Sequence, residues 1–254
     1  MRHCLFIGDA HIVPEDKAFQ ERLSKFLVSL PGVYDHLFVM GDLFEFWFGF
    51  EGYSYENEYG PVLEAFRYIV SKGVQIIYFE GNHDFFMGSI FTRELGAQVY
   101  PDAHSFEVEG ERWFMTHGDL VAAEGLRYGT YRKLIRNPLT YGLIRLLGPR
   151  WTLKMAWKFG AMSHKVYHTP ESYDATKYTT FVKKKFAAGY DAVIMGHTHR
   201  AGVITYHVGD KERFYVNCGD ARNAETYVTY HPGQGFEVQK GLEPLRGDTT
   251  LQSE

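Results

Sequence analysis

Apolar residues in the first eighty positions alternate between short continuous runs and longer stretches with helical spacing. Three runs have the length of a buried strand: residues 2–8, 36–40 and 74–79. Two intervening stretches carry apolar residues three or four positions apart, as an amphipathic helix does: residues 15–30 and 58–72. Pro31-Gly32 ends the first predicted helix and Gly73 ends the second. This order of elements predicts an α/β fold whose first strands are parallel.

The pattern changes at about residue 98. Apolar stretches at 98–108 and 112–116 flank Glu109-Gly110-Glu111, which indicates a β-hairpin. Helical patterns follow, interrupted by Asn137-Pro138 and Gly148-Pro149: residues 126–136, 139–147, 151–164 and 172–188. After a strand at 192–195, the last third alternates like antiparallel strands: residues 201–208, 212–217, 225–231 and 235–240. We expect one domain, residues 1–254, in which two sheets share a core, helices lie outside, and a helical insertion spans about 120–170.

Composition and charge narrow the classes of protein to consider. A net charge of −4 argues against nucleic-acid binding driven by phosphate attraction. Residues 126–170 nevertheless hold nine Lys or Arg and no Asp or Glu, so this segment either faces an anionic partner or forms a solvated rim. Cys4 and Cys218 are too few for a disulfide framework and are expected to be buried free thiols. Without a leader or a run of about 18 apolar residues, we expect a cytoplasmic protein whose membrane contact, if any, is peripheral.

Five apolar runs end in a glycine beside side chains that bind metals. The side chains delivered in this way are Asp9, His11, Asp42, Asn82, His117, His197 and His199. Carboxylate, amide oxygen and imidazole suit Mn²⁺, Fe²⁺ or Zn²⁺, whereas Ca²⁺ or Mg²⁺ favours oxygen ligands alone. Each motif alone is explained by a turn or by chance, but their joint occurrence after strands is not. Seven ligands are too many for one ion and suit two ions that share a carboxylate, for which we choose Asp42.

In order along the chain, these motifs resemble those of the calcineurin-like metallophosphoesterases, over residues 3 to about 220. The matching motifs are Asp9-x-His11, Gly41-Asp42, Gly81-Asn82-His83-Asp84, His117-Gly118-Asp119 and Gly196-His197-Thr198-His199. The resemblance implies a four-layer β-sandwich flanked by helices. It also implies two ligand sets: Asp9, His11, Asp42 and His199 for one ion, and Asp42, Asn82, His117 and His197 for the other. His83 would contact the phosphate or assist the leaving group, with Asp84 orienting it, and Asn82 would help to stabilise the added charge.

Two further segments resemble one branch of that family, the UDP-2,3-diacylglucosamine pyrophosphatases of lipid A biosynthesis. They are Gly41-Asp42-Leu43-Phe44-Glu45-Phe46-Trp47, and His117-Gly118-Asp119 followed by Tyr128, Arg132 and Asn137-Pro138. That branch releases UMP and 2,3-diacylglucosamine 1-phosphate (lipid X), and a helical cap holds the acyl chains over the site. The insertion here is both basic and apolar, as is typical of an interfacial helix, so we expect peripheral contact with the cytoplasmic face of the inner membrane. The residues expected to touch the substrate are Arg132, Ser163, Lys165, Lys177 and Glu124.

Two positions depart from the better-known members of the branch. Those members carry Arg at the position of His83, and a second acidic residue where this chain has Ala122-Ala123-Glu124-Gly125. Two alternatives therefore stand beside the lipid pyrophosphatase. One is a hydrolase of a soluble phosphodiester or phosphomonoester, in which the aromatic cap serves only as a lid. The other is a binding module whose metals organise an interaction surface without turnover.

Overall fold

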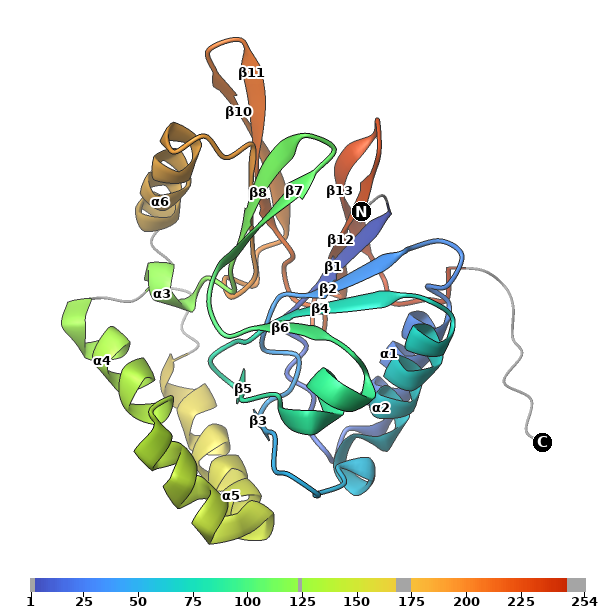
Figure 1. Cartoon of the computed structure of the whole chain (residues 1–254), viewed down its shortest axis with the longest axis vertical. Helices are drawn as coiled ribbons and strands as arrows, with labels where there is room; N and C mark the ends of the chain where they lie inside the picture. Colours follow the sequence, from blue (N-terminus) through green and yellow to red (C-terminus); the bar gives the residue numbers. More distant parts are fainter. Residues whose placement is uncertain (1–2, 123–124, 168–174, 246–254) are drawn as a thin grey trace.

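The computed structural model describes residues 3–122, 125–167 and 175–245 (Figure 1). Over these residues one sheet has six strands in the order β13-β12-β1-β2-β4-β6. Their bounds are β1 (Cys4–Ile7), β2 (His36–Val39), β4 (Gln75–Phe79), β6 (Gln98–Tyr100), β12 (Thr226–His231) and β13 (Gly235–Lys240). β1, β2 and β4 run parallel, as predicted, and β6 is also parallel to β4, whereas β12 is antiparallel to β1.

The second sheet has five strands in the described part of the chain, in the order β10-β11-β9-β8-β7. Their bounds are β7 (His104–Val108), β8 (Glu111–Met115), β9 (Ala192–Met195), β10 (Gly202–Val208) and β11 (Lys211–Asn217). β8, β9 and β11 are mutually parallel, and antiparallel hairpins add β7 and β10 at the edges. A short ribbon of β3 (Trp47–Phe48) and β5 (Asp84–Phe85) pairs the aromatic loop after β2 with the loop after β4.

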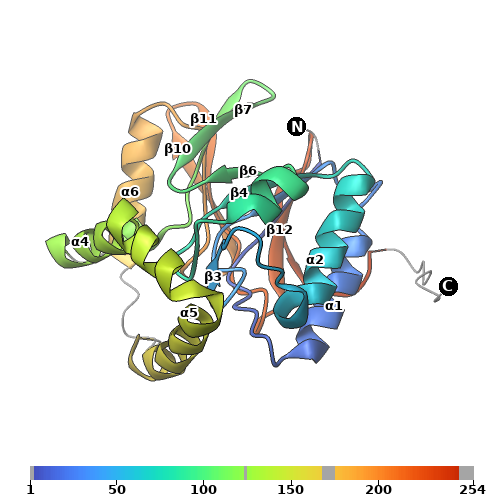
Figure 2. The same cartoon turned by 60° about the horizontal axis from the view of Figure 1, so that its bottom comes forward.

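The two sheets pack face to face, and helices cover their outer faces, which makes four layers (Figure 2). Alternation along the strands divides the apolar residues between layers. Leu5 and Ile7 of β1 pack toward α1 (Lys17–Val28) and α2 (Glu56–Ser71). Cys4 and Phe6 instead join Trp113 and Met115 of the second sheet in the central core. On the far side, Tyr178, Val182 and Phe186 of α6 (Ala175–Ala187) pack on Phe114 and Val193. The predicted mixed α/β class is correct.

A helical pair projects beyond the sheets between β8 and α6 (Figure 1). A short helix, α3 (Asp119–Ala122), leads into α4 (Gly125–Ile135), and α5 (Pro138–Tyr167) returns beside it. We call α4 and α5 the cap. α5 is interrupted at Gly148, whose φ of 76° and ψ of 167° break the helix where Gly148-Pro149 predicted a break. No helix in the described ranges is both long enough and apolar enough to cross a membrane.

Three details of the predicted elements were wrong. The stretch 98–108 is two strands in different sheets, because Pro101 and Asp102 leave β6 before the chain begins β7 in the second sheet. The last four strands are not one antiparallel run, since β10 and β11 belong to one sheet and β12 and β13 to the other. The predicted loop 43–50 contains the two-residue strand β3, and a one-turn π-helix, η1 (Ile90–Glu94), follows β5. The first two errors share a cause: local alternation identifies a strand but not the sheet that it joins.

Candidate metal centre

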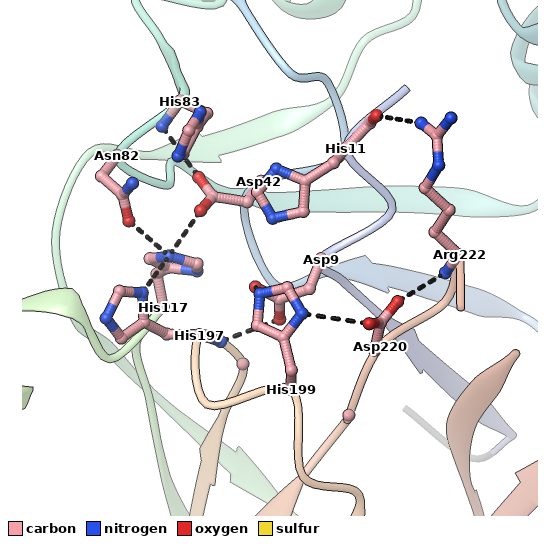
Figure 3. A network of polar contacts seen from close by, with 12 residues as sticks. Asp9, His11, Asp42, Asn82, His83, His117, His197, His199, Asp220 and Arg222 are labelled. Carbon is pink, nitrogen blue, oxygen red and sulfur yellow. Dashed lines mark hydrogen bonds and ion pairs between the residues drawn. The ribbon is translucent and has the colours of Figure 1, made fainter. Parts of the chain in front are cut away.

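Every predicted ligand follows the carboxyl end of a parallel strand, and the two sheets bring these ends together (Figure 3). Asp9 and His11 follow β1, Asp42 follows β2, and Asn82 follows β4. From the second sheet, His117 follows β8, and His197 and His199 follow β9. The structure therefore brings all seven predicted ligands into one cluster.

The backbone at this cluster is unusual. In the described residues, eight non-glycine residues have a positive φ, and five of them are predicted ligands: Asp9, His11, Asp42, His197 and His199. Side chains disfavour this left-handed conformation, and when it persists in a group it marks a functional site held by its surroundings. Close backbone approach also requires glycine here. A Cβ on Gly81 would lie 2.1 Å from Asp42 Oδ1, and one on Gly41 would lie 2.5 Å from His117 Nδ1.

One half of the cluster consists of Asp9, His11 and His199, whose ligand atoms lie within 4.8 Å of one another. Asp9 is fully buried, and its Oδ2 accepts a hydrogen bond from the backbone N–H of His197 at 2.8 Å. Its Oδ1 lies 3.5 Å from His199 Nε2 and has no hydrogen-bond donor among the described residues. A buried carboxylate oxygen without a donor, facing an imidazole nitrogen, is the chemistry that a divalent cation satisfies.

The other half consists of Asp42, Asn82, His117 and His197. His117 Nε2 lies 3.3 Å from Asp42 Oδ2, 3.1 Å from Asn82 Oδ1 and 3.2 Å from His197 Nδ1. Four potential ligand atoms therefore face one small volume. Asp42 also belongs to a group with His11 and His83, so its carboxylate lies between the two halves. The donor set fits a pair of divalent ions with Asp42 shared.

In three of the histidines, the Nδ1 atom of the imidazole ring contacts an oxygen atom. His117 Nδ1 donates to the carbonyl of Met40 at 2.8 Å, His11 Nδ1 faces Glu45 Oε2 at 3.1 Å, and His199 Nδ1 faces Asp220 Oδ2 at 3.1 Å. Metal-binding histidines are oriented in this way, because the outer contact fixes the tautomer and leaves Nε2 as the ligand. Sequence reasoning gave no role to Glu45 or Asp220. Asp220 itself follows an apolar run and Gly219, so a signal of the same kind was present for it.

The histidines of the cluster have pKa values that are shifted in opposite directions. Burial works to lower the pKa of His11, but the Glu45 hydrogen bond and the charges of Asp42 and Asp9 raise it to about 9. Burial likewise opposes protonation of His117, whereas Asp42 raises the pKa of His117 to about 10. Burial and the neighbouring His117 lower the pKa of His197 to about 3. Protons on His11 and His117 thus supply positive charge that bound cations would replace.

The structure corrects the expected role of Asp84. Its carboxylate does not orient the His83 ring. It accepts hydrogen bonds from the backbone N–H groups of Asp42, Leu43, Phe44 and Gly81 and from the Tyr78 hydroxyl. His83 Nδ1 instead contacts the carbonyl of Glu45 at 3.0 Å and lies 3.7 Å from Glu45 Oε1. Asp84 therefore joins the two loops that carry Asp42 and Asn82, and Glu45 positions His83.

The predicted substrate contacts are placed less uniformly. Arg132 lies on α4, where it pairs with Asp119 at 3.0 Å and with Asp102 at 2.5 Å, so it ties the cap to the start of α3 and to the turn between β6 and β7. Lys177 lies near the start of α6. Glu124 and the side chains of Ser163 and Lys165 lie outside the described residues.

Sequence reasoning missed Arg136, although it lies in the basic segment. Its guanidinium donates to the carbonyl of Gly81 at 2.6 Å and to Glu80 Oε2 at 3.0 Å. Arg136 thereby fixes the cap to the loop that carries Asn82. Beside Arg136, a cavity of about 240 Å³ lies between the cap and the core. It is lined by Gly49, Phe86, Gly88, Arg136, Pro138 and Tyr141.

The fold and the ligand cluster define a metal-dependent phosphoester hydrolase, and the chain belongs to the calcineurin-like phosphoesterase family, whose model matches residues 3–201. The chain is 30% identical to the UDP-2,3-diacylglucosamine hydrolase of Xanthomonas campestris pv. campestris, over 85% of this chain and 90% of that protein. It is 26% identical to the UDP-2,3-diacylglucosamine hydrolase of Nitrosococcus oceani, over 96% of this chain and 97% of that protein. The Psychromonas ingrahamii protein of the same name is 28% identical, over 93% of each chain.

Proposed function

We propose that this chain hydrolyses the pyrophosphate bond of UDP-2,3-diacylglucosamine to UMP and 2,3-diacylglucosamine 1-phosphate, with two Mn²⁺ ions as cofactors. The observation that carries the proposal is a seven-ligand cluster next to a cap that is basic and exposes apolar side chains. The named relatives, similar over most of their length, support the same substrate. The donor set also accepts Fe²⁺ or Zn²⁺, so the preference for Mn²⁺ is part of the proposal.

We assign the ligands by their grouping. Asp9, His11 and His199 would hold one ion, Asn82, His117 and His197 the other, and Asp42 would bridge them. A pair of divalent ions polarises the phosphoryl group and activates water near neutral pH. The protein contributes the burial of Asp9, Asp42 and His117, which keeps bulk water from competing for these charges.

We assign to His83 a contact with the phosphoryl oxygens or the leaving group. Its Nδ1 faces the Glu45 carbonyl at 3.0 Å, and a carbonyl accepts only, so the proton lies on Nδ1. Nε2 is then the atom that meets the substrate. The rings of His83 and His11 meet edge to face, with centroids 4.9 Å apart. His83 therefore borders the group of Asp9, His11 and His199, which we call the first ligand group.

The cap supplies the surface expected for a lipid substrate. Leu139, Leu146 and Trp151 are 85%, 84% and 64% exposed, so these apolar residues do not pack on the protein itself. Arg145 and Lys154 lie on the same helix, and residues 126–170 contain no acidic residue. Exposed apolar side chains among cations suit an anionic membrane surface, so we propose peripheral contact with the inner membrane through α5. The cavity beside Arg136, with Phe86 and Tyr141 in its wall, offers apolar space at the base of the cap for an acyl chain.

The decisive experiment compares Mn²⁺-dependent hydrolysis of three compounds: UDP-2,3-diacylglucosamine, UDP-N-acetylglucosamine and bis-p-nitrophenyl phosphate. We expect UMP from the diacylated compound alone, and none with a His117→Ala variant. Turnover of the simple diester without the lipid would overturn the substrate and favour a soluble phosphodiester. Full metal binding without any turnover would instead favour a non-catalytic module.

Membrane contact has its own test. Wild-type protein should sediment with vesicles that contain anionic phospholipid, and Leu146→Asp should release it. Ile204→Asp is the matched control, because Ile204 is also exposed, at 49%, but lies on β10 away from the cap. Equal loss of sedimentation in both variants would refute a specific role of the cap.

A further inference from the structure

The loop after β11 contributes to the metal centre although it lies beyond residues 3–201, which the family model matches. We call residues 217–223 the C-terminal loop. Figure 3 shows two of its side chains directed at the first ligand group: Asp220 toward His199, and Arg222 toward the backbone of His11. Asp220 Oδ2 lies 3.1 Å from His199 Nδ1. The Arg222 guanidinium donates a hydrogen bond of 2.6 Å to the carbonyl of His11.

Asp220 is held so that one oxygen faces His199. Its Oδ1 accepts from the backbone N–H groups of Arg222 at 2.9 Å and Asn223 at 2.8 Å. Its Oδ2 accepts from Asn223 Nδ2 at 2.9 Å and faces His199 Nδ1 at 3.1 Å. A carboxylate fixed by three donors has little freedom to turn away. It therefore places the imidazole proton on Nδ1 and directs Nε2 toward Asp9.

Arg222 holds the backbone of the second ligand in the same group. One guanidinium nitrogen donates to the carbonyl of His11 at 2.6 Å, and the other donates to Asp16 Oδ2 at 2.6 Å. Asp16 is the N-cap of α1, where its Oδ1 accepts from the N–H of Phe19 at 3.1 Å. Arg222 thus links His11, whose φ is 42°, to the start of a regular helix. A left-handed non-glycine residue needs such outside support to persist.

The loop itself is firmly seated. Asn217 Nδ2 donates to the carbonyl of Gly196 at 2.8 Å, and the N–H of Asp220 donates to Thr226 Oγ1 at 2.9 Å. At Gly219, with a φ of 80°, an added Cβ would lie 2.2 Å from Thr226 Oγ1. The contacts to His199 and His11 therefore come from a preorganised segment.

We propose that the C-terminal loop is a positioning element for one ion of the pair: Asp220 acts through His199, and Arg222 acts through His11. This inference rests on the proposed two-ion site. The other ion does not depend on the loop in the same way. The ring of His117 is held by the Met40 carbonyl at 2.8 Å, and His197 turns Nδ1 toward His117 at 3.2 Å. Loss of Asp220 should therefore weaken the binding of the ion at Asp9, His11 and His199 more than the binding of the other ion.

The test is a titration of Mn²⁺ followed by electron paramagnetic resonance of the free ion, which needs no turnover. We expect wild type to bind two ions, and Asp220→Ala to bind one of them about 10–100-fold more weakly, the usual effect of losing the partner of a metal-binding histidine. Arg222→Gln should weaken the same ion. Asp191→Ala is the matched control, because Asp191 accepts from the N–H of Arg112 at 2.9 Å and is not among the residues that group around the predicted ions.

Backgrounds that retain one site identify the ion. In a His117→Ala background the remaining ion is held by Asp9, His11 and His199, so adding Asp220→Ala should weaken it about 10–100-fold. In a His11→Ala background the remaining ion should be unaffected by Asp220→Ala. Asp220→Asn, which keeps the shape of the side chain but not its charge, should weaken the first ion less and serves if the alanine variant does not fold.

Three results would overturn the inference. Unchanged affinity of both ions in Asp220→Ala would show that His199 needs no partner, and equal weakening of both would make the loop a general scaffold. A wild-type chain that binds fewer than two ions would overturn the two-ion centre itself and with it this inference. That last failure is recognised in the wild type alone, before any variant is compared.

Discussion

Replacement of Asp84 by Asn should destabilise the protein far more than its conservative shape suggests. The carboxylate accepts hydrogen bonds from four backbone N–H groups and one hydroxyl, and the side chain is fully buried. Asp84 Oδ1 accepts from Asp42 and Gly81, and Oδ2 accepts from Leu43, Phe44 and the Tyr78 hydroxyl. Whichever way the amide of Asn turns, its NH₂ group faces at least two backbone N–H donors that lose their acceptor.

The expected cost follows from that count. Each buried donor left without an acceptor costs about 1–3 kcal/mol, so Asp84→Asn should lower the free energy of unfolding by about 2–6 kcal/mol. The total free energy of unfolding of a native protein is only about 5–15 kcal/mol. Tyr78→Phe removes one donor and leaves the carboxylate its four N–H partners, so it should cost about 0.5–1.5 kcal/mol. The same Asp→Asn exchange at Asp210, in an exposed turn, should stay within about 0.5 kcal/mol of wild type.

Urea unfolding in EDTA measures these effects without a contribution from bound metal. Tryptophan fluorescence reports the transition, because Trp47 and Trp113 are fully buried and lie in different cores. If Asp84→Asn unfolded within about 0.5 kcal/mol of wild type, comparable to the surface control, the view of Asp84 as the acceptor that joins the two metal loops would be refuted.

Three further predictions concern the metals and the cap. Mn²⁺ at about 100 times its dissociation constant should raise the free energy of unfolding by about 2.7 kcal/mol for each site, and EDTA should reverse this; equal stability with and without the ion would contradict a folded-state site. Metal binding at pH 8 should release up to about two protons per chain and should strengthen as pH rises, because His11 with a pKa of about 9 and His117 with a pKa of about 10 must lose their protons to become ligands. Calorimetry in Tris and in HEPES checks this, and a binding heat that is the same in both buffers would exclude it. Arg136→Met should lower the free energy of unfolding by about 3 kcal/mol, because it leaves the buried Glu80 carboxylate without its cation. Arg145→Met, at an exposed site on the cap, should lower it by less than about 0.5 kcal/mol. Equal effects of the two variants in urea unfolding would show that Arg136 does not fix the cap to the core.

Much of the fold was predictable because strands and helices have different periods. The parallel strands at residues 4–7, 36–39 and 75–79, and the break in α5 at Gly148, follow from local pattern and from glycine and proline chemistry. The sheet membership of β6, β7, β12 and β13 was not predictable, because partner choice depends on contacts between distant residues. Local alternation is the same whichever sheet receives the strand.

The ligand cluster could be predicted for a similar reason. A carboxylate, amide or imidazole directly after a buried parallel strand must lie at the edge where neighbouring strands also end. The sequence therefore predicts that Asp9, Asp42 and Asn82 lie close together. Their partners carry no such local signal. Asp220 lies 21 residues from the histidine that it contacts, and Arg222 lies 211 residues from His11.

The sequence alone therefore determined which side chains gather and the chemistry that they offer. Only the tertiary structure decided how they are held: Asp84 joins two loops rather than orienting His83, Glu45 and Asp220 align the imidazoles, and Arg136 fixes the cap to the core. The physical reason is that a strand end sets the position of a side chain through the nearby backbone. Its orientation instead depends on hydrogen-bond partners that long-range packing brings within about 3 Å.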